Sequence, residues 1–144
     1  MQFKAQGVEG LVTGDIYEVA KHEERWLERV CREVGLVPFR PLWQGNTVQI
    51  FKDFISLGFK ASVVRTKLSV LGEAWLGREL NEQFLADIQK LKGVDPCGEG
   101  GEYHTVVTDG PIFRSRIKLL ETRKGSRGEF GRLDIVRFEV EEKR

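Results

Sequence analysis

Glycines punctuate the first half of the chain, and they constrain the fold more than any other feature. Gly35 and Gly58 each lie where a helical pattern of apolar residues stops and a short apolar run begins. A glycine in this place is typical of a helix that ends in a left-handed residue and is followed by a strand. The predicted elements are a strand at 8–12, a helix at 17–34, a strand at 36–39, a helix at 47–57 and a strand at 59–65. Alternating strands and helices favour a parallel, right-handed α/β unit, here over residues 1–66.

Residues 67–144 have a different pattern and predict a small α+β domain. Asn81 suits the N-cap of a helix that continues to Gly93. Alternating residues indicate strands at 103–108, 113–120 and 133–140. A segment rich in glycine and charge at 124–128 predicts the turn that joins the last two strands as a hairpin.

The first six residues predict little more than one turn of helix, closed by Gly7. A helix this short has no stability of its own. We therefore interpret it as the end of a longer element whose beginning lies outside the chain.

The composition excludes several functional classes. The chain has 144 residues, and its 23 basic and 22 acidic residues leave a net charge of +1. This balance argues against broad electrostatic binding to nucleic acid or to a membrane. No apolar run approaches the roughly 20 residues that a membrane helix needs. Only two cysteines are present, which favours a reducing, cytoplasmic location over a disulfide framework.

The first candidate site is the turn of Thr13, Gly14 and Asp15, between a predicted strand and a predicted helix. Ligands of open parallel sheets bind at the carboxyl ends of the strands. Glycine there lets the backbone approach a ligand, and the following helix presents free amides and a positive dipole end. The alternative interpretation is a tight turn in which Asp15 only caps the helix.

The second candidate site is the glycine-rich segment 97–105. Its candidate residues are Gly98, Glu99, Gly100, Gly101, Glu102, His104 and Thr105. Three glycines in four positions cost backbone entropy without adding packing, and carboxylates among them suit recognition of a cationic or polar group. The alternative is a solvated loop. We predict no metal site, because Cys97 and His104 are single ligands where zinc normally needs four.

Taken in order, seven strings give the sequence a resemblance to a known family. They span nearly the whole chain: Val12–Ile16, Arg29–Leu36, Pro41–Trp43, Leu57–Ala61, Ala74–Arg78, Gly98–Thr105 and Asp109–Phe113. The sequence resembles the N-type ATP pyrophosphatase family, in particular its diphthine–ammonia ligases.

The resemblance implies both a fold and a reaction. The fold is the C-terminal part of an adenine-nucleotide α-hydrolase-like parallel sheet, followed by a small α+β domain. The reaction uses ATP and Mg²⁺ to adenylate the carboxylate of diphthine, a modified histidine on a translation elongation factor, and ammonia then displaces AMP. By resemblance, Thr13, Gly14 and Asp15 lie beside the nucleotide, and the segment from Gly98 to Thr105 recognises the substrate. No residue is assigned a catalytic role.

One departure from the family is large. The phosphate loop of the family, a Ser-Gly-Gly-Lys-Asp-Ser string, does not occur in these 144 residues, so the resemblance provides no cradle for pyrophosphate. We expect a fragment, a misassigned start or a shortened relative, any of which exposes a sheet edge that invites homo-oligomers. Three hypotheses follow: an ATP-dependent amide ligase, a non-catalytic substrate-binding or assembly module, and another adenylating enzyme of the same superfamily.

Overall fold

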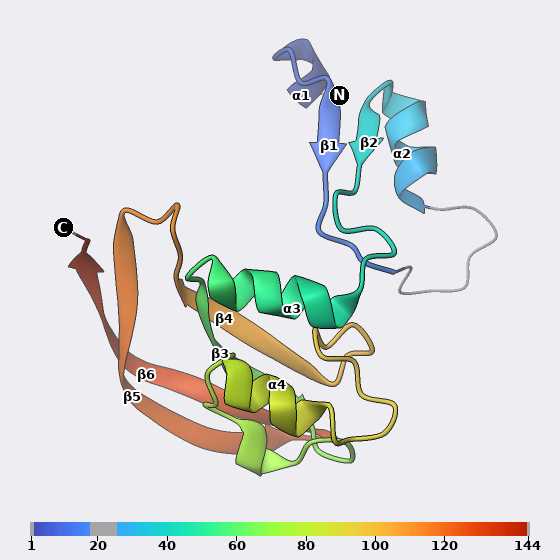
Figure 1. Ribbon diagram of the computed structural model, residues 1–144. Helices are drawn as coiled ribbons and strands as arrows, with labels where there is room; N and C mark the ends of the chain where they lie inside the picture. The colour runs from blue at the N-terminus through green and yellow to red at the C-terminus, as the bar shows by residue number, and fades with distance from the viewer. Residues whose placement is uncertain (1, 18–25, 144) are drawn as a thin grey trace. The chain divides into compact units, whose positions relative to one another are not determined.

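A computed structural model of the chain describes residues 2–17 and 26–143 (Figure 1). The chain forms two compact units, Met1–Asn46 and Thr47–Arg144. The sequence analysis instead divided the chain between residues 66 and 67. The assignment of its two parts to nucleotide binding and substrate recognition stays a prediction.

The first unit pairs two short parallel strands. Its elements are α1 (Gln2–Ala5), β1 (Gly10–Val12), α2 (Trp26–Val34) and β2 (Val37–Phe39). The register joins Gly10 to Val37 and Val12 to Phe39, which confirms a parallel strand–helix–strand unit in this part of the chain. Residues 18–25 of the predicted helix lie outside the described residues. Gly35 has a φ of 67°, so the predicted left-handed end of α2 is confirmed.

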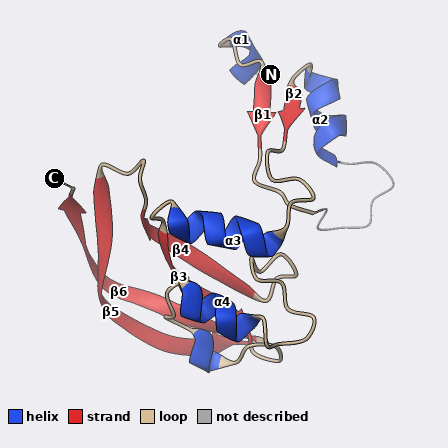
Figure 2. Cartoon of the chain, in the orientation of Figure 1, coloured by secondary structure: helices blue, strands red, loops and turns tan. Residues whose placement is uncertain are grey.

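The second unit packs two helices on one four-stranded sheet. Its elements are α3 (Thr47–Ser56), β3 (Lys60–Lys67), the 3₁₀ turn η1 (Glu73–Trp75), α4 (Glu82–Ile88), β4 (Tyr103–Asp109), β5 (Ser115–Arg127) and β6 (Phe130–Glu142). The strand order is β4-β3-β6-β5, and every pair of neighbours is antiparallel (Figure 2). The molecule is therefore a mixed α/β protein. Among the described strands, β1 and β2 form the parallel pair.

The prediction that residues 59–65 form a third parallel strand is wrong. The strand forms as β3, but it pairs antiparallel with β4 and β6. Apolar periodicity shows that a segment is a strand, but it does not show which partner supplies the hydrogen bonds. The partners of β3 begin at Tyr103 and Phe130, so its pairing depends on residues far along the chain.

Two predicted boundaries also change. The hairpin strands are longer than expected, because the predicted turn at 124–128 is mostly strand and the chain reverses after Arg127, which lies opposite Phe130. Most of the residues of β5 and β6 are exposed, so their sequence carries little alternation to show where each strand ends. Helix α4 ends at Ile88 rather than near Gly93, while its predicted N-cap is confirmed: the Phe84 N–H donates to Asn81 Oδ1 at 2.9 Å.

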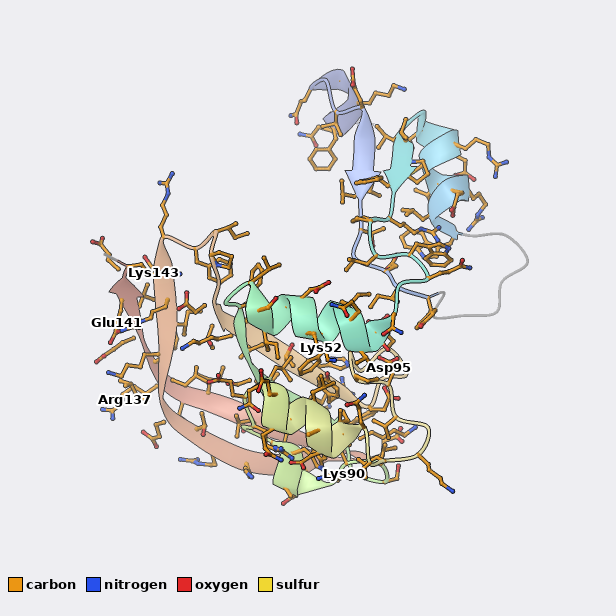
Figure 3. All side chains as sticks on the ribbon, viewed as in Figure 1. Lys52, Lys90, Asp95, Arg137, Glu141 and Lys143 are labelled. Atoms are coloured by element: carbon orange, nitrogen blue, oxygen red, sulfur yellow. The ribbon has the colours of Figure 1, made fainter. Side chains whose placement is uncertain are left out.

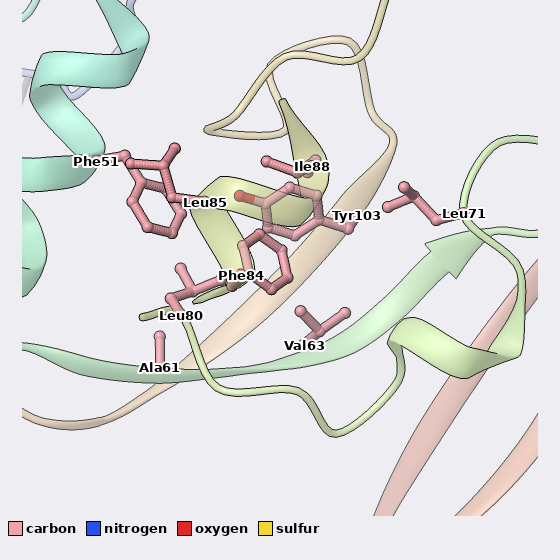
Figure 4. Close-up of a cluster of buried hydrophobic side chains, with 9 residues drawn as sticks. All are labelled: Phe51, Ala61, Val63, Leu71, Leu80, Phe84, Leu85, Ile88 and Tyr103. Carbon is pink, nitrogen blue, oxygen red and sulfur yellow. The ribbon is translucent and has the colours of Figure 1, made fainter. Parts of the chain in front are cut away.

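An aromatic cluster lies at the centre of the second unit (Figure 4). Phe84 is fully buried and its ring lies 5.7 Å from that of Phe51, stacked, and 5.0 and 5.4 Å from those of Trp75 and Tyr103, edge-on. Buried aliphatic residues complete the cluster: Ala61, Val63, Leu71, Leu80, Leu85 and Ile88. Phe84 thus joins both helices, η1 and the sheet in one core. No helix in the described part of the chain is long and apolar enough to cross a membrane.

Truncation of this central ring tests the packing. We expect Phe84→Ala to lower the free energy of unfolding by about 3–5 kcal/mol, because the cavity loses contacts to several elements at once. Chemical denaturation followed by circular dichroism measures the change. The matched control is Phe138→Ala on the exposed surface of β6, where the side chain is 56% exposed and we expect a cost of about 1 kcal/mol or less. Equal costs for the two variants would contradict the assigned core.

Candidate functional site

The glycine-rich segment is folded against the core by three side chains. The Tyr103 hydroxyl donates a hydrogen bond to the Pro96 carbonyl. Glu102 Oε1 accepts from the Asp95 N–H at 3.1 Å, and Asp95 Oδ1 accepts from the Cys97 N–H at 2.7 Å. Asp95 is labelled in Figure 3. Because Tyr103 also packs on Phe84, the position of the segment depends on the core of the second unit.

The glycines of this segment allow atoms to approach closely. Gly98 has a φ of 77°, and a Cβ built there would lie 3.0 Å from the Tyr103 carbonyl oxygen. A Cβ at Gly100 would lie 2.5 Å from Glu102 Oε1, a side-chain oxygen that the Asp95 N–H holds in place. Gly101 has a φ of 79°, which disfavours other residues. The interpretation of these glycines as a flexible backbone is therefore incomplete, because two of them make room for Tyr103 and Glu102.

Burial separates the two predicted carboxylates. Glu102 is 7% exposed, and its Oε2 is buried with no hydrogen-bond partner among the described residues. Glu99 is exposed. Glu102 thus holds the segment from inside, whereas Glu99 presents its carboxylate to solvent. A buried carboxylate oxygen without a donor is costly and would gain from an N–H group brought by a ligand.

His104 and Thr105 lie on β4 directly after this segment. Both are exposed, and in the register His104 lies opposite Arg65 while Thr105 lies opposite Val63. Side chains alternate along a strand, so His104 points away from the face on which Tyr103 packs. Among the residues that the structure describes, no group of three His, Cys, Asp or Glu side chains is placed to hold a metal ion.

Cys97 is a neutral thiol in this setting. Its Sγ donates to the Thr47 carbonyl at 3.2 Å. Burial, and then the nearby carboxylates of Asp95 and Glu99, raise the pKa of the thiol to about 12. Burial also raises the pKa of Tyr103. Because thiolates, not thiols, are the nucleophiles and metal ligands, Cys97 is suited to a structural role.

The predicted turn at Thr13, Gly14 and Asp15 lies in the first unit, at the carboxyl end of β1. The Thr13 N–H donates to the Phe39 carbonyl at 3.0 Å, so the carboxyl ends of both parallel strands meet there. The Asp15 N–H donates to Thr13 Oγ1 at 3.3 Å. A Cβ at Gly14 would meet no atom within 4 Å, which leaves open space beside the backbone. Of the predicted helix 17–34 that Asp15 would cap, residue 17 is not helical, and residues 18–25 lie outside the described residues.

Arg40 is a further polar residue at this edge, and the sequence analysis missed it. Its guanidinium forms an ion pair with Glu28 and lies 4.2 Å from the centre of the Trp43 ring. The side chain is only 8% exposed, and its Nε is buried without a hydrogen-bond partner among the described residues. Arg40 directly follows a predicted strand. A rule that flags polar residues at strand ends, as applied to Thr13, would have found it.

A substitution in the glycine-rich segment tests how tightly it is folded. We expect Gly98→Ala to lower the free energy of unfolding by about 1–3 kcal/mol, because alanine is strained at this φ and its Cβ would crowd Tyr103. The matched control is Gly125→Ala on β5, where the nearest atom would lie 3.5 Å away and we expect little loss. Urea denaturation of the three proteins measures the difference. A Gly98→Ala protein as stable as the parent would show a loose, solvated loop instead.

The two predicted groups of site residues lie in different units, and all residues of each group belong to the same unit. Thr13, Gly14 and Asp15 belong to the first unit, and the segment from Gly98 to Thr105 belongs to the second. Their roles in binding nucleotide and substrate stay predictions.

Comparison with known proteins identifies the second unit. Residues 46–140 match the family described as the diphthamide synthase C-terminal domain. The chain is 35% identical over 115 residues to the human protein named diphthine–ammonia ligase, an alignment that covers 76% of this chain and 42% of that protein. The fission yeast protein of the same name is 33% identical over 116 residues, which are 79% of this chain and 19% of that protein. The zebrafish protein of the same name is 30% identical over 138 residues, which are 91% of this chain and 52% of that protein.

The chain thus spans about half or less of the length of these three relatives. The match includes the whole glycine-rich segment and begins where the second compact unit begins. The relatives are ligases by name. The chain belongs to the diphthamide synthase C-terminal domain family.

Proposed function

We propose that the chain provides the substrate-recognition part of an ATP-dependent amide ligase of the diphthine–ammonia ligase type. In this reaction the carboxylate of diphthine on a translation elongation factor is adenylated, and ammonia displaces AMP to form the amide. The observation that carries the proposal is the family match over residues 46–140, within which lies a glycine-rich segment that presents an exposed carboxylate.

The acids of the segment suit two different groups. Diphthine carries a quaternary ammonium, which has no N–H to donate and is attracted by charge alone. The exposed Glu99 is accessible to such a group on a protein substrate. The buried Oε2 of Glu102 has no hydrogen-bond partner among the described residues and is suited to accept an N–H from ammonia. Gly98, Gly100 and Gly101 bring the backbone close to both, and His104 and Thr105 extend the polar surface along β4.

The chain offers only one side of a nucleotide site. Gly14 has open space beside it, and its turn lies at the carboxyl ends of two parallel strands, which is a suitable edge for a nucleotide. However, these 144 residues contain no Ser-Gly-Gly-Lys-Asp-Ser string, and the described residues include no group of carboxylates placed for Mg²⁺. The residues present therefore do not fit ATP and Mg²⁺ as a complete site, and we assign no step of adenylation to them.

The second candidate function is a non-catalytic binding or assembly module, in which the domain of residues 46–140 recognises a partner and takes no part in amidation. The two candidates differ in what happens when an activating domain is supplied. An amide ligase domain then supports amidation, whereas a binding module does not.

A chimera tests the first candidate. Residues 46–140 replace the matching segment of the human relative, and mass spectrometry measures amidation of diphthine on the elongation factor. We expect the chimera to be active, and Glu99→Gln to lower its activity about two- to fivefold, because an exposed charge contact to the substrate is lost. The matched control is Glu129→Gln, an exposed glutamate in the hairpin turn, which should have little effect. An inactive but folded chimera would favour the binding module.

Calorimetry of the chain itself tests the incomplete nucleotide site. We expect weak or no binding when ATP and Mg²⁺ are titrated into the chain, because the backbone amides and lysine of a phosphate loop are absent. ADP and AMP serve as comparisons, since a site for the adenosine part alone would bind all three equally. Micromolar binding that requires Mg²⁺ would contradict the expectation and place an ATP site in this chain.

A further inference from the structure

A cleft of about 670 Å³ opens between α3, α4 and the start of β3, away from the glycine-rich segment. Its apolar lining comes from five side chains: Ile55, Phe59, Leu80, Leu85 and Ala86. The volume lies within the roughly 300–1,000 Å³ of sites that bind small molecules. Leu80 and Leu85 also belong to the aromatic core (Figure 4), so the floor of the cleft is fixed by packing.

Four charged side chains line the same cleft, two of each sign. Lys52 lies on α3 and is labelled in Figure 3, and Lys60 begins β3. Glu79 and Glu82 belong to the segment that leads into α4. All four are exposed, and across residues 2–17 and 26–143 none of them forms an ion pair. Lys60 lies beside the segment of the two glutamates, because the Leu80 N–H donates to the Ala61 carbonyl at 2.9 Å, whereas Lys52 lies on α3. Lys52 and the two glutamates therefore come from different elements that line the cleft.

We propose that this cleft binds a zwitterionic ligand with an apolar body, whose carboxylate meets Lys52 on α3 and whose ammonium meets Glu79 and Glu82. A purely anionic ligand would meet the two glutamates, and a purely cationic ligand would meet the two lysines. The charges of the lining sum to zero, so a ligand that carries both charges gains at each end and loses at neither. The apolar body covers the floor, which supplies the non-directional part of the affinity.

The proposal does not rest on the amide ligase function. It concerns different residues, and it is tested by binding rather than by amidation. A cleft without affinity for zwitterions would leave the proposed reaction untouched, and an inactive chimera would leave the cleft untouched.

Three small molecules of matched length test the cleft in the full chain. ε-Aminocaproate carries both charges, caproate carries only the carboxylate, and n-hexylamine carries only the ammonium. Each is titrated at neutral pH into chain labelled with nitrogen-15, and amide chemical shifts report the site and the Kd. We expect shifts concentrated in α3, α4 and the start of β3. Since an exposed ion pair changes affinity by up to about fivefold, we expect each singly charged molecule to bind about two- to fivefold more weakly than ε-aminocaproate.

Two substitutions test whether the charged side chains, rather than the apolar floor, cause the preference for ε-aminocaproate. Lys52→Gln should abolish the preference for ε-aminocaproate over n-hexylamine, and Glu82→Gln should abolish its preference over caproate. The matched controls are Lys92→Gln and Glu121→Gln, exposed residues that do not line the cleft, and both should keep the parent's preferences. Three results would overturn the proposal: no shifts, shifts centred on another part of the chain, or equal binding of the three molecules by the parent. The proposal would also be overturned if Lys52→Gln and Glu82→Gln both kept the parent's preference for ε-aminocaproate.

Discussion

The packing of Tyr103 connects the core of the second unit to its candidate site. Its ring packs edge-on with the ring of Phe84, and its hydroxyl donates to the Pro96 carbonyl just before the glycine-rich segment. The position of the segment therefore depends on the core. A buried aromatic ring with a polar end is well suited to this task, because it contributes apolar area and still satisfies a backbone oxygen.

The same segment shows how glycine and glutamate act together. Gly100 leaves room for the carboxylate of Glu102, and that carboxylate accepts the Asp95 N–H. A larger residue at position 100 would displace the carboxylate, and loss of the carboxylate would leave the Asp95 N–H without its partner. The folded segment exposes Glu99 and leaves one oxygen of Glu102 that no described residue satisfies.

The two units differ in what they contain. The second unit matches the diphthamide synthase C-terminal domain over nearly its whole length. The first unit supplies a parallel strand pair, an open turn at Gly14 and the ion pair of Arg40 with Glu28. These features suit the border of a ligand site. The cleft lined by Lys52 and Glu82 is a separate feature of the second unit.

The sequence by itself determined most of the local structure and the location of the candidate sites. Helix ends at Gly35 and Gly58, the N-cap at Asn81 and the existence of each predicted strand follow from neighbouring residues, because capping, turns and side-chain alternation are local interactions. The glycine-rich segment was identified for the same reason, since its composition fits neither helix nor strand.

Only the tertiary structure decided which strands pair and which acids are buried. β3 is antiparallel because its partners come from residues 103–109 and 130–132, and strand partners so distant in sequence leave no local signal. Glu99 and Glu102 look alike in sequence, but one is exposed and the other is held beneath the segment by the Asp95 N–H. Arg40 gains its buried position from Glu28 and Trp43. Burial and partner choice depend on the whole fold, and for that reason they could not be predicted from residue type and spacing.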